Sequence, residues 1–138
     1  MKLDHIGIVV KSIEKSVEHW KIVFGYSRCT ETVVNTRQQV RVVFLEKEGS
    51  LPIKLIEPVG SGSAIAAQAK RGGGLHHLCF KCESLLGELN RLQDLGLRVL
   101  AHPQPGEAFD NEDIAFVYAG QGLNIELIDT EKKARKLT

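Results

Sequence analysis

Two histidines and a glutamate stand in short apolar segments that are far apart in this sequence. His5 lies in the segment 3–8 and His77 in the segment 75–80, which repeats the pattern 72 residues later, while Glu126 lies in a third apolar segment. Two imidazoles and one carboxylate are a frequent ligand set for Fe²⁺, Ni²⁺, Co²⁺, Mn²⁺ or Zn²⁺. A divalent ion held there would polarise a substrate carbonyl and stabilise a developing enolate. The competing interpretation, two hydrogen-bonded structural histidines, is weaker because the two histidines occupy matching positions.

The same 72-residue offset continues along the chain. Ser12 and Ser84 are 72 residues apart, and two further pairs of segments keep that spacing: Val42–Leu45 with Ile114–Val117, and Ile53–Glu57 with Ile125–Asp129. A constant offset through several segments indicates an internal duplication. We therefore predict an α+β fold made of two tandem βαβββ modules that form a pseudo-symmetric, curved mixed sheet around a cleft.

Each module is expected to run as a strand, a helix and three further strands. Alternating apolar residues predict first strands at 2–10 and 75–82, and apolar residues at helical spacing predict helices that begin after Ser12 and Ser84 and stop at Gly25 and Gly96. The weaker second strands are expected near 30–34 and 98–101, and the segment 102–113 is expected to be a loop. The predicted single domain, 1–138, has modules at about 1–60 and 73–130, a linker with a short helix at 61–72, and a solvated polar tail at 131–138.

The alternation of side chains along strands predicts which residues face the cleft. Residues two apart share a face, so His5 and His77 lie opposite the faces that pack on the helices, and Lys54 and Glu126 join them. His76 is a direct neighbour of His77 and is expected to point to the other face, outside a metal site.

Lys54 breaks the symmetry of this constellation, because it is the repeat mate of Glu126. Two neutral histidines, one carboxylate, an ammonium group and a divalent ion leave two surplus positive charges in a partly dry cleft. Three outcomes are compatible with the sequence. Lys54 turns away from a metal held by His5, His77 and Glu126; or it is held neutral and acts as a base; or it pairs with Glu126 and replaces the metal.

Composition limits the classes of function. The 138 residues are 43% hydrophobic and 25% charged with a net charge of +1, which argues against a nucleic-acid partner, and no apolar run is long enough to span a membrane. Three cysteines, without a recognisable secretion signal, favour a cytoplasmic location. We expect a small-molecule substrate, and a homodimer because duplicated modules expose sheet edges.

The segments around His5, His77 and Glu126 resemble those of the vicinal oxygen chelate superfamily, which includes glyoxalase I, methylmalonyl-CoA epimerase, extradiol dioxygenases and bleomycin-resistance proteins. The residues 53–58 and 72–77 are most similar to the epimerase branch. The resemblance covers nearly the whole chain and implies one divalent metal ion, such as Co, Ni, Zn, Mn or Fe, with His5, His77 and Glu126 as ligands. The fourth ligand in the family is Glu or Gln, where this chain has Lys54.

The resemblance implies an isomerase or lyase that transfers a proton next to a metal-chelated carbonyl of a small thioester or related substrate. A methylmalonyl-CoA epimerase-like activity is favoured over that of lactoylglutathione lyase, with Glu126 and Lys54 as the candidate catalytic residues. Two alternatives stay open. One is a non-catalytic binding protein of the antibiotic-resistance type, free of metal because of Lys54, and the other is extradiol oxygen chemistry with Fe²⁺ at the same triad.

Overall fold

The computed structural model describes residues 1–138 and has an α+β fold with nine strands, three α-helices and one short 3-10 turn. In chain order the elements are β1 (Lys2–Val9), α1 (Ile13–Phe24), β2 (Ser27–Arg28), β3 (Val33–Asn35), β4 (Val40–Glu46), β5 (Ile53–Pro58), α2 (Ala66–Lys70), β6 (Gly74–Lys81), α3 (Leu85–Asp94), β7 (Arg98–Gly106), η1 (Glu107–Phe109), β8 (Glu112–Tyr118) and β9 (Asn124–Ile128).

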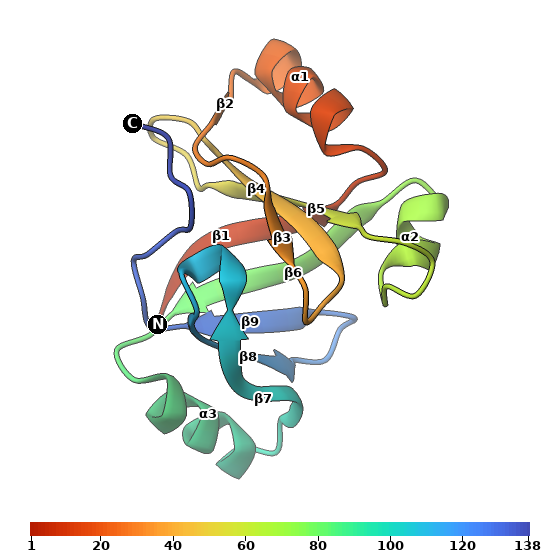
Figure 1. The fold of residues 1–138 in the computed structure, drawn as a ribbon. Helices are drawn as coiled ribbons and strands as arrows, with labels where there is room; N and C mark the ends of the chain where they lie inside the picture. The colour runs from red at the N-terminus through yellow and green to blue at the C-terminus, as the bar shows by residue number, and fades with distance from the viewer.

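The strands form one mixed sheet in which two similar halves meet at β1 and β6. The order is β2-β4-β5-β1-β6-β9-β8-β7, and β3 pairs with β4. β1 is parallel to β5, and its repeat mate β6 is parallel to β9, while β1 and β6 are antiparallel to each other. The two halves of one chain therefore build the cleft together, with β1 and β6 at its centre (Figure 1).

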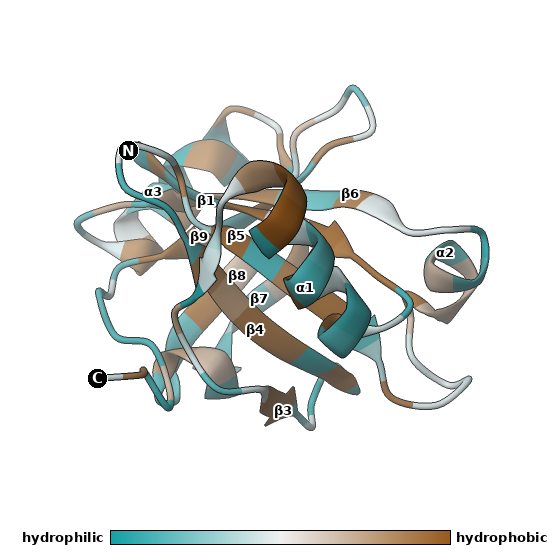
Figure 2. Cartoon of the chain, turned by 90° about the horizontal axis from the view of Figure 1, so that it is seen from above, coloured by the Kyte–Doolittle hydropathy of each residue, from teal (hydrophilic) through white to brown (hydrophobic).

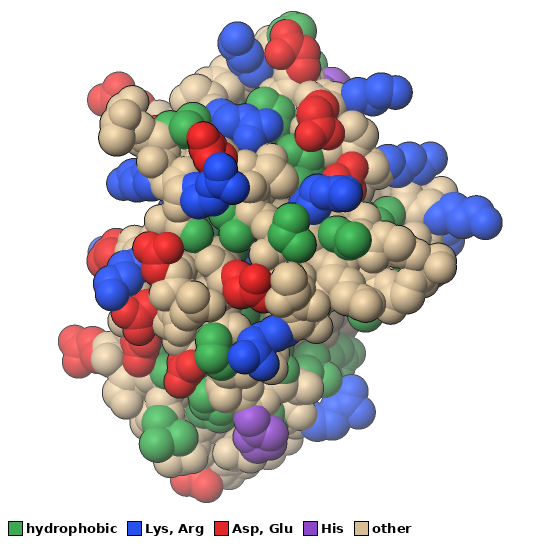
Figure 3. Space-filling view, in the orientation of Figure 1, with side chains coloured by type: hydrophobic (Ala, Val, Ile, Leu, Met, Phe, Trp, Pro, Cys, Tyr) green, Lys and Arg blue, Asp and Glu red, His purple; other side chains and the backbone are tan.

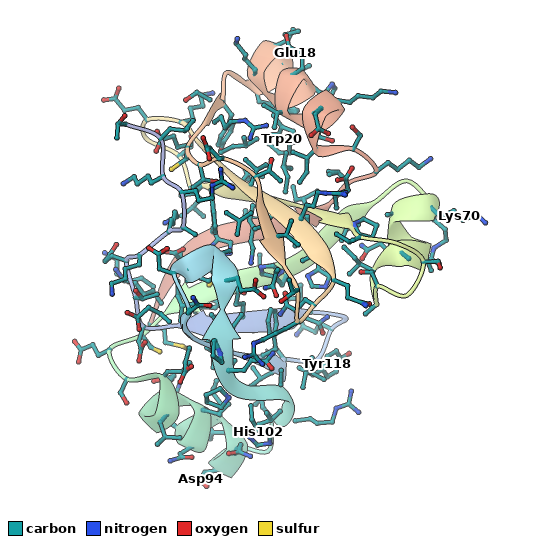
Figure 4. All side chains as sticks on the ribbon, viewed as in Figure 1. Glu18, Trp20, Lys70, Asp94, His102 and Tyr118 are labelled. Carbon is teal, nitrogen blue, oxygen red and sulfur yellow. The ribbon has the colours of Figure 1, made fainter.

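The helices cover the outer side of each half, as the apolar spacing predicted. Ser12 and Ser84 cap α1 and α3 by accepting hydrogen bonds from backbone N–H groups three residues later, and Gly25 ends α1 in the left-handed conformation. α1 and α3 lie at opposite ends of the molecule (Figure 1). In Figure 4, Trp20 points from α1 toward the sheet and Glu18 points away from it.

Three apolar clusters divide the interior. One packs α1 against the first half of the sheet and another packs α3 against the second half. The third lies on the opposite side of the sheet, between the halves, and includes Val42, Phe44, Phe109 and Phe116. Figure 2 shows the hydrophobic colour of β4, whose residues contribute to both faces.

The segment expected to be a loop at 102–113 is mostly regular, so this expectation was wrong. β7 continues through Pro103 and Pro105 to Gly106, and η1 follows. β7 is the last strand of the sheet, and an edge strand tolerates proline because one of its sides lacks ladder partners. η1 then lies against the segment that follows β3, where Glu107 Oε1 accepts hydrogen bonds from the backbone N–H and the hydroxyl of Thr36, at 2.7 and 2.6 Å.

The tail after β9 is not simply solvated. Most of its side chains are exposed, but Ala134 is buried, and its backbone N–H donates to the carbonyl of Ala108. Farther along, the Leu137 N–H donates to the Cys29 carbonyl, so the tail crosses from the second half to the first.

None of the helices qualifies as a membrane span, the longest being the 12-residue α1. Figure 3 shows basic and acidic side chains interspersed on the face of the molecule that it presents.

Candidate metal centre

The four polar residues of the predicted cleft face surround the junction of the two halves. Gly7 of β1 is paired with both Lys54 and His77, and its repeat mate Cys79 is paired with both His5 and Glu126. The pairing of neighbouring strands thus brings together residues that are up to 121 positions apart, from His5 to Glu126. All four polar side chains are buried, with at most 2% of each residue exposed.

His5, His77 and Glu126 point three possible ligand atoms at one small volume. Glu126 Oε1 lies 3.0 Å from His5 Nε2 and 3.3 Å from His77 Nε2, and the two Nε2 atoms are 3.4 Å apart. Ligands about 2.1 Å from one ion are separated by about 3.0 Å in octahedral and about 3.4 Å in tetrahedral geometry. Glu126 Oε1 is buried and has no hydrogen bond of acceptable geometry despite these short distances. The donor set and its spacing therefore fit a divalent transition metal ion.

Asp4 determines how His5 presents its ring. Asp4 Oδ2 lies 2.7 Å from His5 Nδ1, and a carboxylate accepts hydrogen bonds but does not donate them. Burial raises the pKa of Asp4, but its hydrogen bond with His5 and the charges of His5, Lys133 and Lys81 together outweigh this and lower it, so Asp4 is ionised at neutral pH. His5 Nδ1 is therefore the donor, and Nε2 is the ring atom directed at the centre.

Lys54 neither turns away nor displaces Glu126 from the histidines. Lys54 Nζ lies 3.3 Å from Glu126 Oε2, so the carboxylate uses one oxygen for the ammonium and the other for the imidazoles. The Lys54 ammonium also lies over the rings of Phe44 and Phe109, 5.8 and 5.1 Å from their centroids. Of the three arrangements compatible with the sequence, the one in which Lys54 leaves the site is contradicted.

The pKa values of Glu126 and His77 are both lowered, for different reasons. Burial raises the pKa of Glu126, but the charge of Lys54 and the contacts with His77 and His5 together hold it well below its usual range. Burial lowers the pKa of His77 to about 4, although Glu126 opposes the change. At neutral pH His77 is thus neutral and Glu126 ionised, which are the forms that bind a metal ion.

The absence of a side chain at Gly7 makes room for His77. A Cβ atom at Gly7 would lie 2.2 Å from His77 Cε1 and 2.5 Å from Nδ1, well inside the distance that real atoms reach. The equivalent residue of the other half, Cys79, carries a buried thiol whose pKa is raised by burial and by the Glu126 charge. The symmetry of the backbone is therefore not matched by symmetry of the side chains at these two positions.

His76 lies on the cavity side, and the expectation that it points to the other face was wrong. Its Nδ1 atom is 2.7 Å from Nδ1 of His77, and it lines the same cavity. The pairing of β1 with β6 shifts register between Gly7 and Ile8, which leaves His76 as an extra residue on β6. Such a bulge changes the direction of a side chain, so the alternation of a regular strand does not apply here.

A cavity of about 430 Å³ leads to this centre. Lys54, His76 and His77 are its ionisable groups on the sheet, while His5 and Glu126 lie behind them. The rest of the wall is mostly apolar and consists of Val40, Val42, Ile56, Leu100, Ala101 and Phe116. Two loops, residues 37–39 and 62–65, border it. The sequence did not single out most of these wall residues, because their grouping depends on how the halves meet.

Known proteins similar to this chain were found by sequence and by structure. The model of the Glyoxalase/Bleomycin resistance protein/Dioxygenase superfamily matches residues 4–116. An uncharacterized Bacillus subtilis protein, YqjC, is 32% identical over 93% of this chain and 91% of its own length. An ethylmalonyl-CoA/methylmalonyl-CoA epimerase from Cereibacter sphaeroides is 27% identical over 85% of this chain and 87% of its own.

Solved structures of epimerases have the same fold. Methylmalonyl-CoA epimerase from Mycobacterium tuberculosis superposes with a TM-score of 0.82 at 29% identity, over 93% of this chain and 87% of that one. A variant of the Streptomyces coelicolor enzyme, in complex with 2-nitronate-propionyl-CoA, gives a TM-score of 0.83 at 28% identity, over 95% of this chain and 98% of that one. The duplicated modules and the match over most of the sequence lead to one assignment: this chain belongs to the glyoxalase, bleomycin resistance protein and dioxygenase superfamily.

Proposed function

We propose that this protein is a metalloenzyme that moves a proton at the carbon next to the carbonyl of a small acyl thioester, with a methylmalonyl-CoA epimerase-like activity. Epimerases are among its relatives in sequence and in structure. The Streptomyces coelicolor relative binds 2-nitronate-propionyl-CoA, which favours an acyl-CoA over a glutathione adduct as substrate.

The observation that carries the proposal is the unsatisfied Oε1 atom of Glu126 between two imidazole nitrogens. Three acceptors at this distance repel one another unless a proton or a metal ion lies between them. We propose that His5, His77 and Glu126 hold a divalent metal ion here. When bound, the ion would polarise the thioester carbonyl and stabilise the enolate that forms when the neighbouring carbon loses its proton.

Lys54 and Glu126 are the proposed acid–base pair. Lys54 faces the cavity, and its ammonium group lies 3.3 Å from Glu126 Oε2. Beside an ion held by His5, His77 and Glu126, Lys54 would more readily lose one Nζ proton to solvent, which leaves a neutral amine, while Glu126 stays ionised as a ligand. The amine lone pair then accepts the substrate proton: the C–H bond breaks, an N–H bond forms, and the electron pair moves to the carbonyl oxygen.

The apolar wall supports this role, because it excludes water from the reacting carbon. Val42 and Phe44 come from β4 and bring no ionisable group to the site, so we assign the proton transfer to Lys54 of β5, which lines the cavity, with Glu126 of β9 as its buried partner. Because Lys54 and Glu126 lie on one side of the cavity, we expect the first measurable reaction to be exchange of the substrate proton with solvent.

The test is deuterium incorporation into methylmalonyl-CoA in D₂O, measured by mass spectrometry, with protein purified without chelators and analysed for metal. We expect stoichiometric transition metal, and deuterium uptake that Lys54→Met abolishes and a chelator suppresses. Lys70→Met is the matched control, since Lys70 projects from α2 away from the sheet (Figure 4). No deuterium above the protein-free rate excludes the epimerase activity. If acyl-CoA esters still raise the unfolding temperature, the non-catalytic binding function stands instead.

We further propose a cytoplasmic homodimer, as the sequence predicted. The three cysteines are free thiols, which favours a reducing compartment. Sedimentation equilibrium at micromolar concentration measures the oligomeric state, and a mass of one chain would contradict the dimer.

A further inference from the structure

The two halves of the sheet carry a β-bulge at the same place. In β1 the register shift between Leu3 and His5 leaves Asp4 without a partner in β6, and in β6 the shift opposite Gly7 and Ile8 leaves His76 without a partner in β1. Asp4 and His76 are 72 residues apart, so they are repeat mates. Each precedes one of the two central histidines, and each is turned by its bulge toward that histidine.

The two contacts have the same length but different chemistry. Asp4 Oδ2 and His76 Nδ1 each lie 2.7 Å from the Nδ1 atom of the histidine that follows. A carboxylate only accepts, so His5 always carries its proton on Nδ1. A neutral imidazole nitrogen either donates or accepts, so His77 has two tautomers that both satisfy its contact with His76.

The two tautomers differ at the centre of the site. If His76 donates from Nδ1, then His77 carries its proton on Nε2, which faces His5 Nε2 at 3.4 Å. That proton occupies the space between the acceptors. If His76 accepts at Nδ1, then His77 has a free lone pair on Nε2, and His76 carries its own proton on Nε2. Each ring keeps one proton in both cases, so the change is a shift of protons and not a change of charge.

We propose that His76 is the positioning residue of His77: it accepts a hydrogen bond from His77 Nδ1–H when a divalent ion binds, and so presents its own Nε2–H as a donor in the cavity. The inference rests on the metal site of the proposed function. The two bulges then have equivalent positions but different partners. Asp4 only accepts a hydrogen bond from His5, whereas His76 can either donate to His77 or accept from it. The direction of this hydrogen bond also links metal binding to the polarity of the cavity wall, because His76 lines that cavity.

Long-range ¹⁵N–¹H NMR of the histidine rings tests the tautomers directly, with Zn²⁺ as the probe and no substrate. His5 is expected to carry its proton on Nδ1 with and without metal. On addition of Zn²⁺, His77 is expected to be protonated on Nδ1 and His76 on Nε2. His76→Asp copies the repeat mate Asp4, so it should hold His77 in the Nδ1–H tautomer even without metal.

Zn²⁺ affinity gives a second measurement. Loss of an outer hydrogen-bond partner lowers metal affinity about 10- to 100-fold, which we expect for His76→Ala. His76→Asp and His76→Asn retain an acceptor near the position of Nδ1, so both should bind Zn²⁺ more tightly than His76→Ala. His102→Ala is the matched control, because His102 is exposed near α3 (Figure 4) and should bind Zn²⁺ as the wild type does.

A Zn²⁺-loaded protein with the His76 proton on Nδ1 overturns the inference, and so does an unchanged Zn²⁺ affinity in His76→Ala. If the wild type takes up no Zn²⁺, this inference and the metal centre of the proposed function fail together. If Zn²⁺ binds with the expected tautomers but no deuterium enters methylmalonyl-CoA, the proposed activity fails and this inference stands.

Discussion

The buried Glu126 carboxylate contacts the Lys54 ammonium and two imidazoles. Replacing Lys54 by methionine removes the ammonium group and keeps a side chain of similar length. At 3.3 Å and an effective dielectric constant of about 20, the two charges attract each other by about 5 kcal/mol. Breaking a buried ion pair from one side typically costs about 3–5 kcal/mol, because the remaining charge has no compensation. We therefore expect Lys54→Met to lower the free energy of unfolding of the metal-free protein by about 3–5 kcal/mol.

Equilibrium unfolding in urea, with chelator present, measures this loss. Glu126→Gln should also destabilise the protein, because it leaves the Lys54 ammonium buried. The double variant removes both charges and should be more stable than either single variant. Zn²⁺ should restore most of the stability of Lys54→Met, since the ion neutralises Glu126 and binds only the native state.

The pH dependence of Lys54→Met should have the opposite sign to that of the wild type. In the wild type the pKa of Glu126 is held low, so its contribution is present above the unfolded-state pKa and is lost as pH falls through the folded one. Without Lys54, burial dominates and raises that pKa, so the contribution of Glu126 to stability should increase as pH is lowered from 7 to 5, measured against the loss that His77 causes in both proteins. A loss below about 1 kcal/mol, or a double variant whose losses simply add, would refute the ion-pair reasoning.

Three further outcomes follow from the same site. The pKa of His77 falls from 6.5 to about 4 on folding, so the unfolded chain binds a proton at a higher pH than the folded one. The free energy of unfolding of the metal-free protein should therefore decrease by about 3 kcal/mol as pH falls from 6.5 to 4. In urea unfolding experiments, His77→Gln should remove this pH dependence. Gly7→Ala should displace the His77 ring, cost about 1–3 kcal/mol in urea unfolding and weaken Zn²⁺ binding in calorimetry, whereas Gly62→Ala, whose Cβ meets only a side-chain oxygen at 3.4 Å, should do neither. Asp4→Ala should lower Zn²⁺ affinity about 10- to 100-fold, and an unchanged affinity would contradict its role as the partner of His5.

Much of the fold follows from local patterns in the sequence. The constant offset of 72 residues predicted two modules, and the serine caps and glycine stops placed α1 and α3 correctly. The alternation of side chains placed His5, Lys54, His77 and Glu126 on one side of the sheet, as the structure confirms. These predictions succeed because strand alternation, helix periodicity and capping depend on neighbours within a few residues.

Predictions failed where the pairing of strands overrides the local pattern. His76 was placed on the wrong face because a bulge arises only when β1 and β6 pair with unequal spacing, which neither segment reveals alone. The second part of β7, from residue 102 onward, was predicted to be a loop because prolines are unfavourable in a central strand, and only the order of the sheet shows that β7 lies at the edge. The tail was predicted to be solvated because its partners are distant in the sequence: its backbone hydrogen bonds go to residues 29–31 and 108, and no local pattern shows them.

The sequence by itself thus determined the duplication, the helices and the four polar residues that share a face, including the exchange of a carboxylate for Lys54. Only the tertiary structure decided how those residues meet. It divides the oxygens of Glu126 between Lys54 and the two imidazoles, places Lys54 between Glu126 and the cavity, and turns His76 toward His77. The physical reason is that residue types and periodicity select a face of a strand, whereas distances of about 3 Å depend on the register in which distant strands pair.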